Sequence, residues 1–269
     1  MQFVGHSSPN SLRCFESFLL TMSTQNHNSN STPSSTHVNP NSALSQDDLK
    51  ALVGLEVLRY LTPGDIIGVG TGSTVNHFIK ALETNQALRT GLKGAVSSSE
   101  ATTALLQKIG IPVLEASQVQ GLSLYIDGAD EIDHSGYMIK GGGAALTREK
   151  IVASLAKSFI CIADESKLVK TLGQFPLPLE IIPMAAAQLM RSFKELGASA
   201  KLRLKGDQPW VTDNGQHILD VTGLKITDPV AFESLVSQWA GVVTVGVFAF
   251  QKATLCLLAT PQGVKTLKF

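Results

Sequence analysis

The sequence of 269 residues has no excess of either charge, since 22 basic side chains balance 22 acidic ones. It has no run rich in lysine or arginine, the electrostatic footprint expected of a nucleic-acid binder. It also lacks any stretch near the roughly 20 apolar residues that a membrane-spanning helix needs. These absences argue against nucleic acid and membrane as partners. They favour small-molecule chemistry in a globular protein that can bury a sizeable core.

Cysteine is also scarce, because only Cys14, Cys161 and Cys256 are present, far apart and without metal-ligand spacing. The last two lie in apolar runs, "FICIA" and "ATLCLLA", that are typical of core strands. We therefore expect a reducing, cytoplasmic setting without a disulfide framework.

Charge is missing altogether between positions 23 and 45, where 15 of 23 residues are Ser, Thr or Asn. This composition predicts a disordered N-terminal extension over residues 1–45. Within it, "LRCFESFLL" is a poor signal peptide, because Arg13 is its only basic residue and Glu16 interrupts it. A transit peptide is a weaker alternative. We favour a dispensable extension or an upstream start, with Met22 as an alternative initiator.

Order is predicted to begin at "SQDDLKALVGLEVLRYL", where Ser45 and Asp48 match a capping box. Strands and helices then alternate along the chain. The predicted strands are 66–70, 111–115, 122–126 and 158–163, the predicted helices are 73–82 and 147–157, and 93–110 is a strand, a turn and a helix. This alternation predicts an α/β fold: a doubly wound, mostly parallel Rossmann-like sheet with helices on both faces.

A different pattern follows the prolines Pro176 and Pro178. We predict strands at 179–182, 200–204 and 242–250, helices at 184–197 and 228–241, and a hairpin turn at Asn214-Gly215. The order βαββαβ predicts a second, smaller ferredoxin-like α+β domain at 175–245. The last apolar run, "ATLCLLAT", is expected to return to the first sheet, so the Rossmann-like domain would comprise 46–174 and 246–269.

Three polar loops follow predicted strands, where open parallel sheets bind their ligands. In the first, "GVGTGST", glycines allow a phosphate to approach the N-terminus of the next helix. Ser73 replaces the third glycine of the dinucleotide fingerprint, and no lysine precedes Ser73 or Thr74 as in a P-loop. A nicotinamide-dependent oxidoreductase is therefore disfavoured. A monophosphate site and a plain capped turn stay open.

The second loop, "IDGADEID", places several carboxylates after a buried strand. Partial desolvation and mutual repulsion can raise the pKa of such groups, which suits acid–base chemistry. The turn at Gly128-Ala129 is expected to direct Asp127 and Asp130 toward one pocket, while Glu131 and Asp133 are expected to be solvated. A Mg²⁺ or Ca²⁺ site is the rival interpretation, although the spacing is not that of an EF-hand.

The third loop, "KGGGAALTREK", combines three glycines with Lys140 at its start. Its N–H groups could form an anion nest next to the lysine charge. Glu149 follows early in a predicted helix, where it is either a carbon-acid base or an acidic residue favoured by the helix dipole. Lys167, in "ADESK", is a further candidate. His77, His134 and His217 show no pairing suited to a catalytic triad or a zinc site.

The motifs "GVGTGST", "AVSSSEATTALL", "YIDGADEID", "MIKGGGAALTREKI", "FICIADESK", "FPLPLEIIPMA", "VTDNG" and "GVVTVGVFA", in this order, resemble ribose-5-phosphate isomerase of the A type. The resemblance covers about residues 46–269, and "KLRLKGDQPW" looks a few residues longer than is usual in that family. It implies a homodimeric enzyme without cofactor or metal that interconverts D-ribose 5-phosphate and D-ribulose 5-phosphate through an enediolate.

The resemblance also implies a role for each motif residue. Glu149 would be the base, Lys140 and the glycines after it (Gly141, Gly142, Gly143) would stabilise negative charge, and Asp127 and Asp130 would bind sugar hydroxyls around Gly128 and Ala129. Asp127 would assist ring opening. The expected substrate contacts are Thr71, Gly72, Ser73, Thr74 and Lys167, with Lys50 near the phosphate.

Two other functions are weaker hypotheses. An aminosugar-phosphate isomerase or deaminase would need a histidine in the cleft, and none is evident. A non-catalytic sugar-phosphate sensor would be expected to carry a helix-turn-helix or to lack the base, and neither applies.

Overall fold

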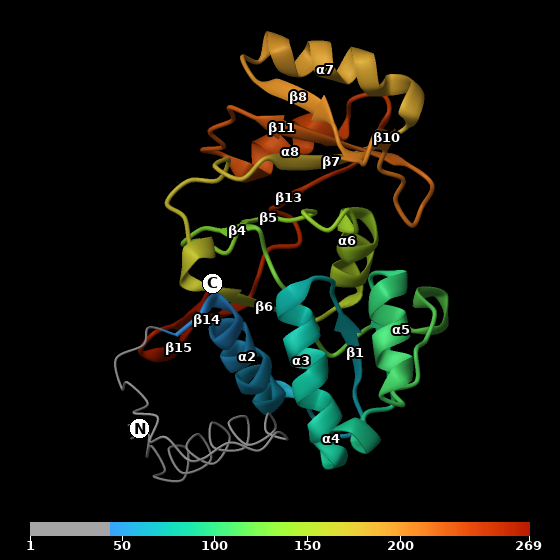
Figure 1. Ribbon diagram of the computed structural model, residues 1–269, viewed down its shortest axis with the longest axis vertical. Helices are drawn as coiled ribbons and strands as arrows, with labels where there is room; N and C mark the ends of the chain where they lie inside the picture. Colours follow the sequence, from blue (N-terminus) through green and yellow to red (C-terminus); the bar gives the residue numbers. More distant parts are fainter. Residues whose placement is uncertain (1–43) are drawn as a thin grey trace, which may run out of the picture. The chain divides into compact units, whose positions relative to one another are not determined.

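The computed structural model describes residues 44–269 (Figure 1). The predictions for residues 1–43, among them those for Cys14 and Met22, lie outside the described residues. The first described helix, α2 (Gln46–Glu56), has the predicted capping box. The Ser45 hydroxyl accepts a hydrogen bond from the Asp48 N–H, and the Asp48 carboxylate accepts one from the Ser45 N–H.

The larger sheet has six strands in the order β15-β14-β6-β3-β1-β2. Five of them are parallel, and β15 is added antiparallel at the edge. Their bounds are β1 Ile66–Val69, β2 Gly94–Ser97, β3 Tyr125–Asp127, β6 Phe159–Asp164, β14 Leu255–Thr260 and β15 Gly263–Lys268. The predicted doubly wound α/β fold is confirmed, and the last apolar run returns to this sheet as β14.

Helices cover both faces of the six-stranded sheet, which is why its five parallel strands are mostly buried and apolar, unlike the edge strand β15. On one face, α2 and α3 (Ser73–Thr84) bury Val53 and Phe78 in a core with β1 and β3. On the other, α6 (Leu146–Leu155) packs Val152 against Tyr125 and Cys161. The shorter helices are α4 (Gln86–Gly91) and α5 (Glu100–Lys108).

The smaller sheet has four antiparallel strands in the order β12-β7-β11-β8. The strands are β7 Leu177–Ile181, β8 Ser199–Leu202, β11 His217–Thr222 and β12 Val242–Val245, and the helices are α7 Ala186–Glu195 and α8 Pro229–Ser237. Both helices contribute to one core with this sheet. The order βαββαβ is the expected one, whereas the domain boundaries at 175 and 245 stay a prediction.

The turn at Asn214-Gly215 is present, closed by a hydrogen bond from the Gly215 N–H to the Thr212 carbonyl. The strand that leads into this turn is very short. Only Val211 bridges to His217, and the preceding residues form a separate small hairpin of β9 (Leu204–Lys205) and β10 (Gln208–Pro209).

Two strand predictions were wrong. Residues 111–115 form only one bridge, between Val113 and Ala95, instead of a strand. The predicted strand 242–250 is split at Gly246 into β12 and β13 (Val247–Phe248), because β13 joins a three-stranded sheet with β4 (Glu131–Ile132) and β5 (Met138–Ile139). A Cβ at position 246 would lie 2.5 Å from the Lys140 carbonyl oxygen, so only glycine fits this crossing point.

Candidate active site

A polar cavity of about 160 Å³ lies at the carboxyl ends of β1, β3 and β6. This is the switch point of the sheet, because the chain continues from β1 to β2 on one side and to β3 on the other. The cavity is lined by Gln46, Lys50, Thr71, Gly72, Ser73, Thr74, Gly128, Ala129, Asp130, Lys140, Gly141, Gly142, Gly143, Glu149, Asp164 and Lys167. None of these has a large apolar side chain, so a ligand must supply polar groups to satisfy them.

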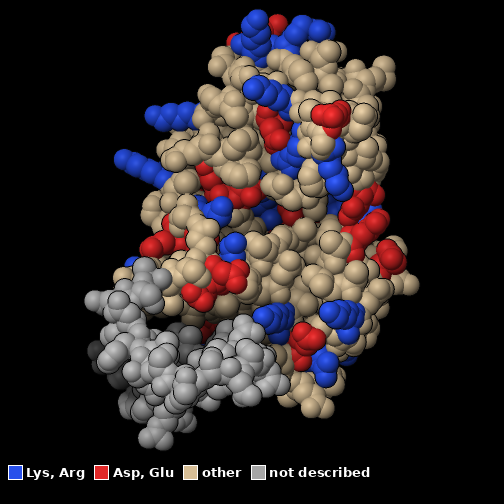
Figure 2. Space-filling model, in the orientation of Figure 1, with Lys and Arg blue, Asp and Glu red and all other residues tan. Residues whose placement is uncertain are grey.

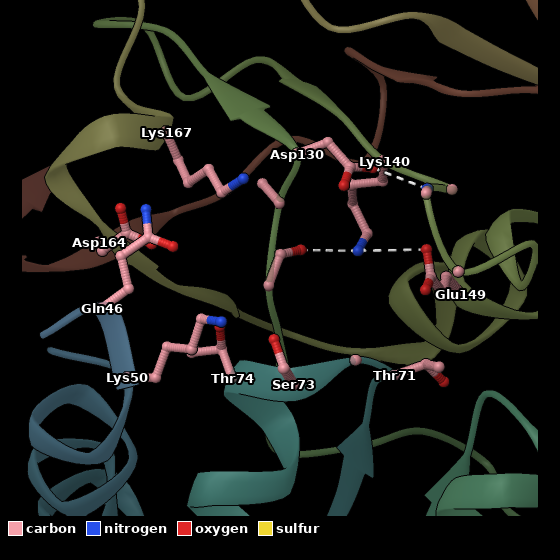
Figure 3. A pocket seen from close by; sticks show the side chains of 16 residues that line it. Gln46, Lys50, Thr71, Ser73, Thr74, Asp130, Lys140, Glu149, Asp164 and Lys167 are labelled. Atoms are coloured by element: carbon pink, nitrogen blue, oxygen red, sulfur yellow. Dashed lines mark hydrogen bonds and ion pairs between the residues drawn. The ribbon is translucent and has the colours of Figure 1, made fainter. Parts of the chain in front are cut away.

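Every predicted site residue except Asp127 therefore lies on the wall of one cavity. In the view of Figure 3, Lys50, Lys167 and Thr74 lie toward one end, and Lys140, Glu149 and Asp130 lie toward the other. The loop after β1 begins with Gly70, where a Cβ would fall 1.9 Å from the Asp127 carboxyl carbon. Glycine at this position lets the two strand ends meet.

The loop from Thr71 to Thr74 presents backbone N–H groups to the cavity, whereas the hydroxyl of its first residue, Thr71, is engaged elsewhere. The Thr71 hydroxyl is held by those of Ser98 and Ser99, at 2.9 and 2.8 Å, so its side chain points away from the cavity (Figure 3). Ser73 and Thr74 begin α3, and among residues 44–269 no side chain caps this helix. Their free N–H groups and the helix dipole make the N-terminus of α3 suitable for an anion.

The expectation that Asp127 faces the pocket was wrong. Asp127 is 0% exposed and does not line the cavity. Its carboxylate accepts hydrogen bonds from the N–H groups of Thr71 and Gly128, from the Tyr125 hydroxyl, and from Lys140 Nζ at 2.7 Å. With both oxygens engaged, Asp127 is a buried anchor for Lys140 and for the two loops around it.

Asp130 lies on the cavity wall, as expected. One of its oxygens accepts a hydrogen bond from the Gly142 N–H at 2.8 Å, and burial raises the pKa of its carboxyl. The expectation of a solvated Glu131 was wrong, since this residue is 3% exposed in β4. Its carboxylate accepts hydrogen bonds from the N–H groups of Gly173 and Phe175, which lie in a partly buried loop.

Lys140 and Glu149 form the most buried charged pair of the cavity, each 3% exposed. Lys140 Nζ donates to Asp127 and to the Gly128 carbonyl at 2.7 Å each, and lies 3.2 Å from Glu149 Oε2. Burial lowers the pKa of Lys140, but the charges of Asp127 and Glu149 outweigh it, so the net shift is upward.

Glu149 behaves differently from its partner. Burial raises the pKa of the Glu149 carboxyl to about 8, against the lowering effect of the Lys140 charge. Its Oε2 accepts no hydrogen bond of good geometry from the residues that the structure describes. A desolvated carboxylate that lines a cavity and is held there by an ion pair is suited to accept a proton from a ligand.

Two cavity residues were missed by sequence reasoning. Asp164, at the end of β6, accepts a hydrogen bond from the Ser166 N–H and so shapes the turn that carries Lys167. Its position at the end of a strand in "ADESK" was an available signal. Gln46, at the start of α2, had no signal, because nothing in the sequence shows that this helix end reaches the cavity.

Neither the charges on the face shown in Figure 2 nor the metal-ligating side chains of residues 44–269 mark a second site. Lysine, arginine, aspartate and glutamate side chains are interspersed on the visible face in Figure 2. Among residues 44–269 no group of three His, Cys, Asp or Glu side chains is arranged to hold a metal ion. No helix of the same region is long and apolar enough to cross a membrane.

Comparison with known proteins assigns the chain to a family. The family model of ribose 5-phosphate isomerase A (phosphoriboisomerase A) matches residues 94–263. Ribose-5-phosphate isomerase A of Albidiferax ferrireducens is 68% identical over 227 residues, which cover 84% of this chain and 96% of that protein. The chain belongs to the ribose 5-phosphate isomerase A family. The protein of the same name from Polaromonas sp. strain JS666 is 64% identical over 88% of this chain and 98% of its own length.

Solved structures of the isomerase family have the same fold as this chain. Ribose 5-phosphate isomerase A from Neisseria gonorrhoeae is 41% identical with a TM-score of 0.79, covering 83% of this chain and 97% of its own. A D-ribose-5-phosphate isomerase in complex with phospho-erythronic acid is 35% identical with a TM-score of 0.80, covering 84% of this chain and 100% of its own. This chain is therefore an isomerase with the α/β architecture of its family.

Proposed function

We propose that the cavity interconverts D-ribose 5-phosphate and D-ribulose 5-phosphate through an enediolate, as a step of the non-oxidative pentose phosphate pathway. The observation that carries the proposal is the buried Glu149 beside Lys140, at the opposite end of the cavity from the N-terminus of α3. Aldose–ketose isomerisation needs a base, a group that stabilises an oxyanion, and an anchor for the phosphate. The two ends of the cavity supply these three groups.

The phosphate is proposed to bind at the N-terminus of α3. Ser73 and Thr74 offer N–H groups there, and Lys50 and Lys167 offer positive charge from α2 and from the turn after β6. Phospho-erythronic acid, which a relative of this chain holds, carries a phosphate at one end and a carboxylate at the other. A ligand of that kind matches a cavity with cations at both ends.

Glu149 is proposed to move the proton between the two carbons. It removes the proton from C2 of the open-chain aldose, which leaves an enediolate with its negative charge on O1. A proton then passes from the O2 hydroxyl to O1, and Glu149 returns its own proton to C1 to form the ketose. Lys140 stays charged because its pKa is raised, so it stabilises the negative charge on the enediolate oxygen. The base contributes typically about 10² to 10⁴ in rate, and charge stabilisation and positioning supply much of the remainder.

The two aspartates have separate roles in this proposal. Asp130, whose raised pKa makes proton exchange easier, contacts the sugar hydroxyls and assists ring opening. Asp127, to which ring opening was first assigned, instead holds Lys140 in place, because its oxygens are already hydrogen-bonded within the protein.

We further propose a cytoplasmic homodimer. Support for self-association comes from exposed apolar side chains near the edge strand β12: Ile182, Met184 and Val243 are 39%, 91% and 40% exposed. Among the described residues, β12 and β15 are edge strands of their sheets, and their outer edges offer further surface for association.

A coupled assay tests the proposed reaction. Purified protein with D-ribose 5-phosphate is expected to form D-ribulose 5-phosphate at an unchanged rate in the presence of a chelator, while D-ribose without phosphate is turned over far more slowly. Loss of activity on chelation would instead support a cation at Asp130, and no turnover of D-ribose 5-phosphate would refute the assignment.

A further inference from the structure

Arg203 contacts the wall of the active site from the small sheet, although it does not line the cavity. It follows β8 directly, and its Nη1 donates to the carbonyl oxygens of Gly141 at 3.1 Å and of Gly142 at 2.9 Å. Both carbonyls belong to the glycine turn, which we define as residues 141–144. Three of the four turn residues line the cavity, so the guanidinium binds the outer side of an active-site loop.

The guanidinium is itself held in a fixed orientation by Asp220 on β11. Arg203 Nε and Nη2 donate to the two carboxylate oxygens of Asp220, at 2.8 and 2.5 Å. A bidentate pair of this kind fixes the plane of the guanidinium as well as its position. One edge of Arg203 therefore binds the small sheet, and Nη1 is left to hold the glycine turn.

The glycine turn needs such support because its backbone is strained at Ala144. Gly141 has φ 104°, and Ala144 has φ 62°, in the left-handed region that alanine rarely adopts. The Ala144 N–H donates to the Gly141 carbonyl at 2.9 Å, so this oxygen accepts from both Ala144 and Arg203. Strained backbone persists only where the surroundings hold it in place, and it is often found at functional sites.

The hydrogen bonds from Arg203 also decide where the N–H groups of the turn point. In a trans peptide the C=O and the next N–H point in opposite directions. Because the Gly141 carbonyl accepts a hydrogen bond from Arg203, the Gly142 N–H points the other way, to Asp130, to which it donates. With the Gly142 carbonyl on Arg203, the Gly143 N–H points away from the guanidinium, and within residues 44–269 it has no acceptor.

We propose that Arg203, fixed by Asp220, is a positioning residue for the isomerisation: it sets the glycine turn so that the Gly143 N–H faces the oxygen on which charge develops. Lys140 and this N–H then stabilise the enediolate from two directions. Because the donor is fixed before the substrate binds, no reorganisation is needed as the charge forms. The inference rests on the proposed isomerase reaction.

Steady-state kinetics of Arg203→Met test the inference, with Arg191→Met on α7 as the matched control. Met keeps the length and apolar stem of the side chain and removes its donors. Arg191 is exposed on the same small region and contacts nothing at the cavity. We expect Arg203→Met to lower kcat by about 10- to 100-fold, somewhat less than removal of a whole oxyanion donor. KM should stay within about threefold, because the phosphate end is untouched.

Arg203→Lys and Asp220→Asn refine the measurement. Arg203→Lys restores the charge without the planar fork, and Asp220→Asn removes the charged anchor but keeps the donors. Both should give kcat values between those of the parent and Arg203→Met. All rates are expressed per mole of folded enzyme, determined by thermal unfolding, so a loss of fold is not counted as a loss of catalysis.

An active parent together with an Arg203→Met variant whose kcat is within twofold of the parent would overturn the inference alone. A loss that appears only in KM, or that the unfolded fraction accounts for, would do the same. A parent that does not isomerise D-ribose 5-phosphate would overturn the proposed function, and the inference with it.

Discussion

The six-stranded and four-stranded sheets contribute to the active site in different ways. All sixteen residues that line the cavity lie between positions 46 and 167. Twelve lie on strand ends, loops or helices of the larger sheet, and the other four, Lys140 to Gly143, directly follow β5 of the three-stranded sheet. The four-stranded sheet, in the upper part of Figure 1, supplies none of them. It instead supplies partners for side chains next to the cavity. The larger sheet and the three-stranded sheet thus carry the reacting groups, and the four-stranded sheet positions them.

Helix α6 shows this division most clearly. Both sequence neighbours of Glu149 bind residues between positions 213 and 247, on or next to the four-stranded sheet. On one side, Arg148 donates to the Asn214 side chain and to the Asp213 carbonyl, at 2.8 Å each. On the other, Lys150 Nζ pairs with Glu233 on α8 and donates to the Val245 and Val247 carbonyls. Glu149 therefore sits on a helix that is fixed at two points.

The largest effect on turnover is expected from Glu149→Gln, on helix α6, which packs against the larger sheet. The amide keeps the shape but cannot accept the proton, so kcat should fall by about 10³-fold or more. Binding of phospho-erythronic acid, measured by calorimetry, should stay within a few-fold, since the phosphate end is unchanged. A fully active variant would show that another group is the base.

The stability of Glu149→Gln serves as its control. Because the folded pKa of Glu149 is raised to about 8, the folded protein binds more protons than the unfolded chain between the usual glutamate pKa and 8. The contribution of this group to stability is therefore present in acid and is lost as the pH rises through 8. Glu149→Gln should melt at least as high as the parent at pH about 8.5, which would exclude misfolding as the cause of inactivity.

A smaller effect on turnover, with a larger effect on stability, is expected from Lys150→Met. It leaves the Glu233 carboxylate, 3% exposed, without its cation. The free energy of unfolding should fall by about 3–5 kcal/mol, measured with urea. The kcat of the folded fraction should fall by less than that of Glu149→Gln. The double variant Lys150→Met/Glu233→Gln should recover part of the lost stability, because it removes the unpaired carboxylate. If Lys150→Met instead kept its stability and lost all activity, the division of roles between the two sheets would be contradicted.

Much of the fold followed from local pattern in the sequence. The capping box at Ser45, the Asn214-Gly215 turn and the alternation of strands with helices are local signals, and all three are present in the structure. The three-stranded sheet was missed because β4, β5 and β13 have only two residues each, too few to show a period. Pairing between residues far apart in sequence decides such short strands.

The location of the candidate site could be predicted from the loops that follow strands. The roles of individual side chains could be predicted less well, because they depend on how deeply each side chain is buried. Glycine and polar motifs located the cavity, yet Asp127 and Asp130 look equivalent in "DGAD". Their difference depends on Tyr125 and Lys140, which surround one carboxylate and not the other. The same limit explains Glu131, whose partners lie more than 40 residues away, and Arg203, whose partner carbonyls lie in a turn about 60 residues earlier in the sequence.

The pH dependence of kcat/KM for D-ribose 5-phosphate tests most directly whether a buried Glu149 is the base. The substrate phosphate is already a dianion above pH about 7, and the pKa of Lys140 is raised, so neither titrates near 8. The free enzyme should gain activity from pH about 6.5 upward and level off just above the Glu149 pKa of about 8. A profile that is flat from pH about 7 to 9 would contradict the account.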